Sequence, residues 1–140
     1  MEDQIPSDLD NLTRTIIGAA FDVSHVLGHG FLEAVYRNAL MVELTKRGMT
    51  VTKEVSFPVL YSGQRVGLYL ADLVVANVVI VEIKAVGAFS PAHSAQVLNY
   101  LQASRLPIGL LLNFGRPRIE VKRLIRSDPA RRSQLASEVS

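Results

Sequence analysis

The sequence contains no cysteine among its 140 residues. Without thiols the chain cannot form a disulfide scaffold, hold an iron–sulfur cluster or build a thiolate zinc site. Long apolar runs are also missing: the longest, 73–81 and 106–112, fall far short of the roughly 20 residues that a membrane helix needs. The beginning of the chain, MEDQIPSDLD, is acidic and lacks an apolar stretch, so we expect no signal peptide. These absences predict a soluble, cytoplasmic protein with no membrane partner.

The composition is that of a folded domain. Apolar residues make up 49% of the chain and charged residues only 20%, which excludes an intrinsically disordered protein. A length of 140 residues fits one compact domain. We expect residues 1–126 to form this domain and residues 127–140 to form a flexible basic tail.

Positive charge is concentrated toward the C-terminal end. Residues 1–104 carry 7 basic and 10 acidic side chains, whereas residues 105–140 carry 8 basic and 3 acidic ones. Such a cluster can neutralise the phosphates of a nucleic acid, and it can equally be the solvated face of a last strand followed by a frayed tail. The candidate nucleic-acid contacts are Arg116, Arg118, Lys122 and Arg123, with Arg126, Arg131 and Arg132 beyond them.

Apolar periodicity changes along the chain from that of helices to that of strands. A 3.6-residue period predicts helices over 8–27, 31–47 and 91–104. Alternation and β-branched runs predict strands over 51–58, 66–75, 78–84, 108–114 and 118–125. The expected fold class is therefore α/β, a single domain with a mixed central sheet flanked by helices in the order α-α-β-β-β-α-β-β.

Three charged residues stand on strands that are otherwise apolar. Glu82 and Lys84 are two residues apart and share a face of their strand, and a turn at Ala76-Asn77 brings Asp72 near Glu82. Two carboxylates buried together need a compensating cation or a proton. Mg²⁺ takes oxygen ligands from one or two carboxylates together with waters and phosphate oxygens. The pattern fits a metal site with a lysine beside it, and it fits equally a buried ion pair or a strand end that reaches water.

Three further residues have surroundings that fit a structural role as well as a functional one. Glu33 lies near the start of the second predicted helix, where the helix dipole favours a carboxylate. Gln96 and Tyr100 are four residues apart on the third helix and share a face. The glycines of 28–30 could cradle a phosphate, and a glycine turn between two helices explains them as well.

Taken together, these residues resemble a known family. Residues 30–36, GFLEAVY, match the motif that names the GxxExxY proteins, a branch of the PD-(D/E)XK nuclease superfamily. The stretches ADLVV, VEIKAV, HSAQVLNYL and LLLNFG match further along in the same order, so that the resemblance covers about residues 12–125. It implies a restriction-endonuclease-like core with the order α-β-β-β-α-β and a metal site.

The resemblance also implies roles for the charged residues. Asp72 and Glu82 stand for the two acids of the motif and would bind Mg²⁺ or Mn²⁺ with the help of the Ile83 carbonyl. Lys84 stands for the lysine that positions the attacking water. Glu33 would be the acid carried by the helix, which binds the metal through water or holds a second ion.

Gln96 and Tyr100 resemble the Q-x-x-x-Y element of RecB-like nucleases, which implies that they orient Lys84 or the scissile phosphate. Two positions depart from the family pattern. Ala71 replaces the usual proline, a common substitution, and Leu70 stands where relatives often carry a basic residue. The second departure implies weaker or differently arranged phosphate binding.

Two functions of different classes follow. The first is a Mg²⁺- or Mn²⁺-dependent nuclease that hydrolyses the phosphodiester bonds of DNA, with RNA as the less favoured substrate. The second is a catalytically inactive nucleic-acid-binding or assembly module on the same fold, which would obtain its specificity from a protein partner or a homodimer. The retained acids and lysine favour the nuclease, because an inactive site has no need to bury them.

Overall fold

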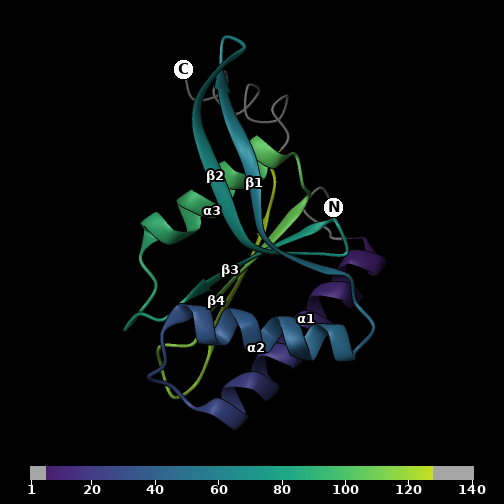
Figure 1. Cartoon of the computed structure of the whole chain (residues 1–140), viewed down its shortest axis with the longest axis vertical. Helices are drawn as coiled ribbons and strands as arrows, with labels where there is room; N and C mark the ends of the chain where they lie inside the picture. The colour runs from purple at the N-terminus through teal and green to yellow at the C-terminus, as the bar shows by residue number, and fades with distance from the viewer. Residues whose placement is uncertain (1–5, 128–140) are drawn as a thin grey trace, which may run out of the picture.

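The computed structural model describes residues 6–127, which form a five-stranded sheet with helices on both faces (Figure 1). The helices are α1 (Ser7–Leu27), α2 (Glu33–Lys46) and α3 (Pro91–Ser104). The strands are β1 (Val51–Tyr61), β2 (Gln64–Val75), β3 (Val79–Lys84), β4 (Ile108–Asn113) and β5 (Glu120–Ile125). The predicted element order and the α/β class are confirmed. No helix within residues 6–127 is long and apolar enough to span a bilayer.

The sheet has the order β1-β2-β3-β4-β5, and all neighbours are antiparallel except β3 and β4. The parallel pair is joined by the crossover helix α3, as parallel strands require. Both of these strands lie almost wholly in the interior. Their continuous apolar runs are thus those of central strands covered on two sides.

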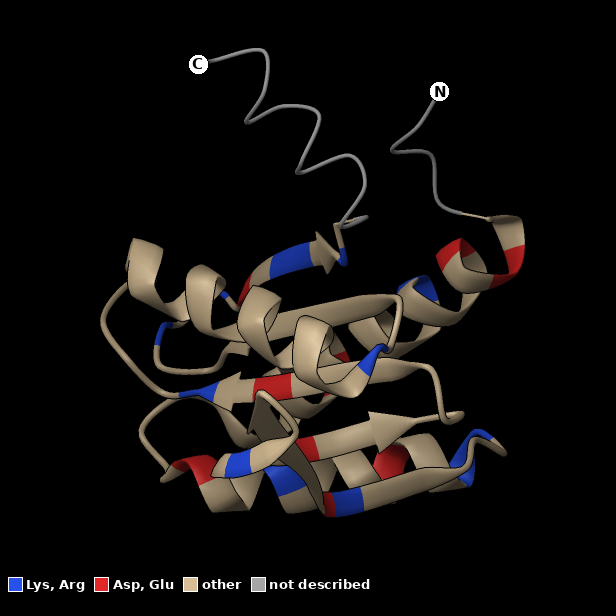
Figure 2. Ribbon diagram, turned by 90° about the horizontal axis from the view of Figure 1, so that it is seen from above, with Lys and Arg blue, Asp and Glu red and all other residues tan. Residues whose placement is uncertain are grey.

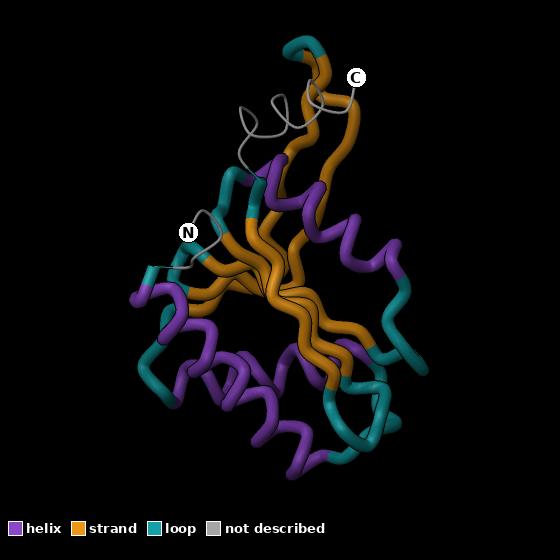
Figure 3. The backbone as a smooth tube through the Cα atoms, turned by 180° about the vertical axis from the view of Figure 1, so that it is seen from behind, coloured by secondary structure: helices purple, strands orange, loops and turns teal. Residues whose placement is uncertain are grey.

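The core is divided into two layers by the sheet, with α1 and α2 on one face and α3 on the other (Figure 3). Val79, Val81 and Ile83 pack toward α1 and α2, whereas Ile80 packs beneath α3. Strand alternation therefore places Glu82 and Lys84 on the α3 face.

The turn between α1 and α2 is closed by Tyr36. Gly28 and Gly30 adopt φ values of 71° and 115°, which favour glycine. The buried Tyr36 hydroxyl donates a 2.6 Å hydrogen bond to the Gly28 carbonyl and accepts one of 3.2 Å from the Phe31 N–H. Its ring stacks on Phe114, which follows β4. The tyrosine of the GxxExxY motif therefore joins the turn to the sheet.

The ends and the inner face of the helices correct three details of the prediction. Ser7 and Asp8 are the residue types that predict an N-cap for the first helix, but Pro6 holds that position and no side chain caps α1. The second helix begins at Glu33 rather than at residue 31. The 3.6-residue period predicts that Leu32 and Val35 point inward, but they are 81% and 39% exposed, because Tyr36 takes the buried position instead.

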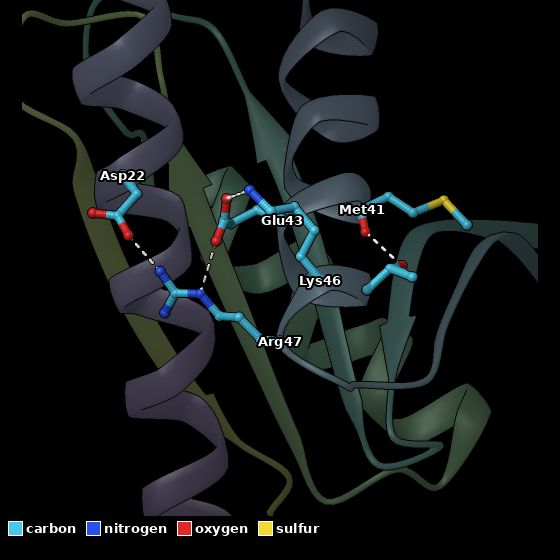
Figure 4. A network of polar contacts seen from close by, with 6 residues as sticks. Asp22, Met41, Glu43, Lys46 and Arg47 are labelled. Carbon is cyan, nitrogen blue, oxygen red and sulfur yellow. Dashed lines mark hydrogen bonds and ion pairs between the residues drawn. The ribbon is translucent and has the colours of Figure 1, made fainter.

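Arg47 joins α1 to α2 on the surface (Figure 4). It follows α2, pairs with Asp22 of α1, and pairs at 3.0 Å with Glu43 one helical turn earlier. The hydrogen bond from Arg47 lowers the pKa of Glu43. Exposed pairs of this kind contribute only ~0.2–1 kcal/mol each, so the two helices are held mainly by their apolar contacts.

The hairpin of β1 and β2 extends beyond the rest of the sheet as an arm (Figure 1). β2 pairs with β3 only over residues 73–75, whereas it pairs with β1 along nearly its whole length. Ser62 and Gly63 form the tip with positive φ values, which suits a tight hairpin turn. Pro58 lies within β1, and an edge strand tolerates it because its missing N–H need not face a neighbour.

We predict that Tyr36→Phe destabilises the fold by about 1–2 kcal/mol, because the Gly28 carbonyl loses a short hydrogen bond while the ring packing is kept. Urea unfolding measures the change. Tyr61→Phe is the matched control, since the Tyr61 side chain is on the hairpin and the residue is 73% exposed. Equal midpoints for the two variants would contradict the role given to the Tyr36 hydroxyl.

Candidate functional site

The most informative contacts lie where β2 separates from β3. The backbone pairing of the two strands ends at Leu73 and Val81. At the next position, the Asp72 N–H donates a 3.0 Å hydrogen bond to Glu82 Oε1, and the Ile83 N–H donates one of 2.8 Å to Asp72 Oδ2. Each carboxylate thus accepts a hydrogen bond from the backbone of the opposite strand. The two acids are held close together at the fork between the strands.

Glu82 is buried, with only 6% of the residue exposed. The same Oε1 atom also accepts a hydrogen bond from the Tyr69 hydroxyl. Burial, followed by the charge of Asp72, raises the pKa of Glu82 to about 7, and the Tyr69 hydrogen bond acts in the opposite direction. Near neutral pH the charged form of this buried carboxylate is therefore unfavourable unless it takes up a proton or a cation lies beside it.

Tyr69 and Tyr100 connect α3 to the buried acid. Their rings are stacked, and the Tyr69 hydroxyl contacts Glu82. Burial, then the charges of Glu82 and Asp72, raise the pKa of Tyr100. Burial and Glu82 raise the pKa of Tyr69 as well, so both tyrosines stay protonated and Tyr69 remains a donor.

A cavity of about 420 Å³ opens on this side of the sheet. Four of the predicted site residues line it, together with residues of the hairpin arm. These four are Glu82, Lys84, Gln96 and Tyr100. The structure therefore brings the acid, the lysine and the Q-x-x-x-Y pair around one space, with Asp72 hydrogen-bonded to its edge through Glu82 and Ile83.

The loop after Lys84 is clamped onto the end of β4 by Asn113. The buried Asn113 side chain accepts hydrogen bonds from the N–H groups of Val86 (3.0 Å) and Gly115 (2.9 Å). Its amide nitrogen donates to the Val86 carbonyl (3.0 Å) and to Glu120 (2.9 Å). A side chain at Gly115 would overlap the Val86 backbone. This clamp fixes the direction in which the chain leaves β3 just past the lysine.

Tyr69 and Asn113 are the two residues of this region that the sequence reasoning missed. Asn113 had a signal, because it is a lone polar residue at the end of the apolar stretch LLLNF. The sequence signal for Tyr69 was weaker. Tyr69 is three residues from Asp72 in the same strand, and strand alternation therefore does not predict that both contact Glu82. The two strands diverge at this point, and only the three-dimensional path of β2 shows the contact.

Glu33 contacts the chain two residues beyond the N–H group that Asp72 accepts from. It is the first residue of α2, it is exposed, and its Oε2 accepts a 3.1 Å hydrogen bond from the Ala85 N–H. It lines a different cavity, of about 640 Å³, which also includes Ala85 and Gly115. Within residues 6–127 no three His, Cys, Asp or Glu side chains are grouped closely enough to hold a metal ion. The structure therefore unites Asp72 with Glu82 and places Glu33 at the exit of β3.

The basic residues expected to contact nucleic acid are not gathered on one face. Arg123 pairs with Asp10 at 2.6 Å, and Arg116 lies 3.7 Å from Glu120. Alternation in β5 places Lys122 on the α3 face, where its Nζ lies 3.5 Å from Ser94 Oγ. Arg118 is exposed in the preceding turn. Basic and acidic segments are interspersed over several elements (Figure 2).

The predicted basic tail is described only at Ser127, whose carbonyl and hydroxyl accept hydrogen bonds from Gln102. Arg131, Arg132 and the rest of 128–140 lie outside the described residues.

The residues at the fork fit a divalent cation. Two carboxylates lie side by side, and burial, followed by the charge of Asp72, raises the pKa of Glu82. A cation between them would compensate both effects. Mg²⁺ is commonly bound by one or two carboxylates, with waters and phosphate oxygens as the remaining ligands. Asp72 and Glu82 would hold it, and their oxygen donors match its preference.

Two of the comparisons with known proteins give a match. A family model described as "PD-(D/E)XK nuclease superfamily" matches residues 10–124. A search of curated proteins finds no match. Among solved structures, the one titled "Crystal structure of SSO0001" is similar with a TM-score of 0.52 and 21% sequence identity, covering 75% of this chain and 55% of that one. The chain thus spans little more than half of that protein, and the likeness concerns the fold.

We predict that Glu82→Gln stabilises the metal-free protein at alkaline pH. The folded chain keeps the Glu82 proton up to about pH 7, whereas the unfolded glutamate releases it near 4.5. The stability from this proton is complete below about pH 4.5 and is lost as the pH rises through 7. Glutamine keeps the accepting oxygen, so the variant should match the wild type at ~pH 4.5 and exceed it by roughly 2–3 kcal/mol at ~pH 8.

Urea unfolding with a chelator present measures both proteins at the two pH values. Glu43→Gln is a control with the opposite expected effect on stability. The Arg47 hydrogen bond lowers the pKa of Glu43, so removal of this carboxylate should lower the stability at alkaline pH. A Glu82→Gln variant that is less stable than the wild type at ~pH 8 would show that Glu82 is not a strained buried acid.

Proposed function

Because the chain belongs to the PD-(D/E)XK nuclease superfamily, we propose that it is a Mg²⁺- or Mn²⁺-dependent nuclease that hydrolyses the phosphodiester bonds of DNA. The observation that supports this most is the pair of carboxylates at the β2–β3 fork, with Lys84 on the same face of β3 as Glu82. The assignment to the narrower GxxExxY branch stays a prediction.

Asp72 and Glu82 are the proposed metal ligands, together with the carbonyl of Ile83. When bound, the metal ion would stabilise charge on the phosphoryl oxygens and lower the pKa of a bound water. Tyr69 serves this pair by donating to Glu82 Oε1, which directs the other carboxylate oxygen away from the tyrosine. Tyr69 is thus a positioning residue.

Lys84 is the proposed group that orients the attacking water and stabilises charge on the phosphate. Lys84 lines the same cavity as Glu82, Gln96 and Tyr100. Gln96 and Tyr100 orient the lysine or the scissile phosphate from the α3 side. The Asn113 clamp supports this arrangement, because it holds the loop that begins directly after the lysine.

Glu33 has an outer role in this proposal. One of its oxygens is engaged with the Ala85 N–H, so it fixes the end of β3 and is left with one oxygen for a water or a second ion. Among the four basic residues predicted to contact nucleic acid, Lys122 is the one we assign to the substrate side, because it lies against α3 on the site's face of the sheet. Arg123, paired with Asp10 of α1, is assigned no such contact.

The proposal predicts that the purified chain cuts DNA when Mg²⁺ or Mn²⁺ is supplied and stops when the metal is chelated. Asp72→Asn and Lys84→Met should each lower the rate by about 100-fold or more, because each removes a charge that acts on the reacting phosphate. Gel assays on single-stranded and duplex DNA measure this.

Lys46→Met is the matched control, since the Lys46 side chain is 71% exposed on α2, on the opposite face of the sheet. Cleavage that survives Asp72→Asn and Lys84→Met would show that another site does the chemistry. A wild-type chain that binds DNA and cuts none would favour the inactive binding module.

A further inference from the structure

The cavity at the fork continues into a second one along α3. This second cavity has a volume of about 700 Å³ and shares Val59 and Tyr100 with the first. Its other lining residues come from the hairpin arm on one side and from the last turns of α3 on the other, as far as Arg105. The two cavities form one groove between the arm and α3, which we call the arm groove. A substrate that reaches Lys84 can extend along it.

The walls of the arm groove carry almost no negative charge. Helix α3 contains no Asp, Glu, Lys or Arg, and residues 55–71 of the arm contain a single charged residue, Arg65. Arg105 stands at the far end of the groove, is exposed, and forms no ion pair within residues 6–127. Among residues 6–127, Glu82 is the one acid that lines either cavity. In this described part of the chain, a polyanion would therefore meet little repulsion along the walls and would reach the unpaired guanidinium of Arg105 at the end.

The arm presents an apolar surface to solvent. Exposed apolar residues on a monomer mark binding surfaces when they are contiguous. On the groove side of the hairpin these are Val59, 39% exposed, and Leu60, 61% exposed, which line the second cavity. Val66, Leu68 and Leu70 alternate along β2 with Gly67 and Tyr69, and because Tyr69 stacks on Tyr100 of α3 they lie on the other face of the hairpin. A single strand can turn its unpaired bases toward the groove wall, whereas a duplex keeps its bases stacked inside, out of its reach.

We propose that the arm groove binds a single-stranded segment of the substrate, with its bases against the hairpin and a phosphate on Arg105. This rests on the proposed function for the identity of the polyanion. Gln96 and Arg105 are nine positions apart, which corresponds to about 14 Å at 1.5 Å per residue. The phosphate on Arg105 is therefore a different one from the phosphate beside Lys84, and the groove sets which strand enters the site.

The test is the binding of a short fluorescent single-stranded DNA to the full chain, measured by anisotropy with a chelator present so that no metal-dependent cleavage occurs. Arg105→Asn should weaken binding several-fold and lower the slope of log K against log salt by about 0.7, the value for one lost phosphate contact on a single strand. Asparagine tolerates the left-handed backbone at this helix end (φ 62°). Arg105→Lys should restore most of the affinity.

Arg14→Gln is the matched control, because it removes one positive charge from α1, on the other side of the sheet. A second pair of variants tests the apolar wall: Leu60→Glu places an acid in the groove and should weaken binding, whereas Val42→Glu, at a residue 62% exposed on α2, should not. Equal losses within either pair would overturn the proposal. So would duplex DNA that binds as tightly as the single strand and is equally sensitive to Arg105→Asn.

Light scattering after gel filtration measures the molar mass, and so tests the alternative in which a second copy of the chain covers the arm. A dimer that Leu60→Glu dissociates without loss of DNA binding would contradict the proposal. Hydrolysis of bis(p-nitrophenyl) phosphate by the wild-type chain with Mn²⁺ tests the nuclease chemistry separately. Binding through Arg105 by a chain that hydrolyses no diester would support the groove while refuting the nuclease.

Discussion

The structure depends on two crossed hydrogen bonds, which the Asp72 N–H donates to Glu82 and the Ile83 N–H donates to Asp72. At the fork of β2 and β3, each side chain accepts from the backbone of the strand opposite, where a ladder of carbonyl acceptors would otherwise continue. These contacts satisfy the N–H groups that strand separation exposes. They also set two carboxylates side by side, which is unfavourable unless a proton or a cation intervenes. The same feature thus ends the sheet pairing and creates the candidate metal site.

Several neighbouring features follow from this constraint. Because β2 leaves β3 at the fork, the β1–β2 hairpin becomes an arm, and the space between the arm and α3 becomes the groove that leads to Lys84. Tyr69 lies on the departing strand and contacts Glu82 from the side of α3. Asn113 completes the support from the end of β4. The arrangement gives the catalytic proposal and the groove proposal a common structural cause.

Local sequence signals were enough to predict the element order and the main turns. Three signals each locate an element to within a few residues. They are the turns at glycine and asparagine, the change of apolar period from 3.6 to 2, and the two fully apolar strands. They were not enough at α2, whose apolar residues do not form one clean stripe. There the choice of Tyr36 over Val35 as the buried residue depends on the Gly28 carbonyl and on Phe114, which the sequence places far apart.

The candidate site was likewise predictable from the sequence only in part. Strand alternation and the hairpin turn were enough to predict that Asp72, Glu82 and Lys84 lie together, because both signals are local in the sequence. The position of Glu33 was not accessible in this way. Its contact with the Ala85 N–H, two residues beyond the N–H that Asp72 accepts from, is set by how α2 crosses the sheet. The contacts of Tyr69 and Asn113 likewise arise from strand divergence and loop packing, for which one chain's sequence carries no periodic signal.

The most direct test of the account is a crystal of the chain soaked in Mn²⁺, in which anomalous diffraction locates the ion without reference to activity. We expect one ion with oxygen ligands from both Asp72 and Glu82, and Glu33 outside its direct ligands. An ion held elsewhere, or carboxylates that remain bridged only by backbone hydrogen bonds with no ion bound between them, would contradict the claim that the β2–β3 fork is a metal site.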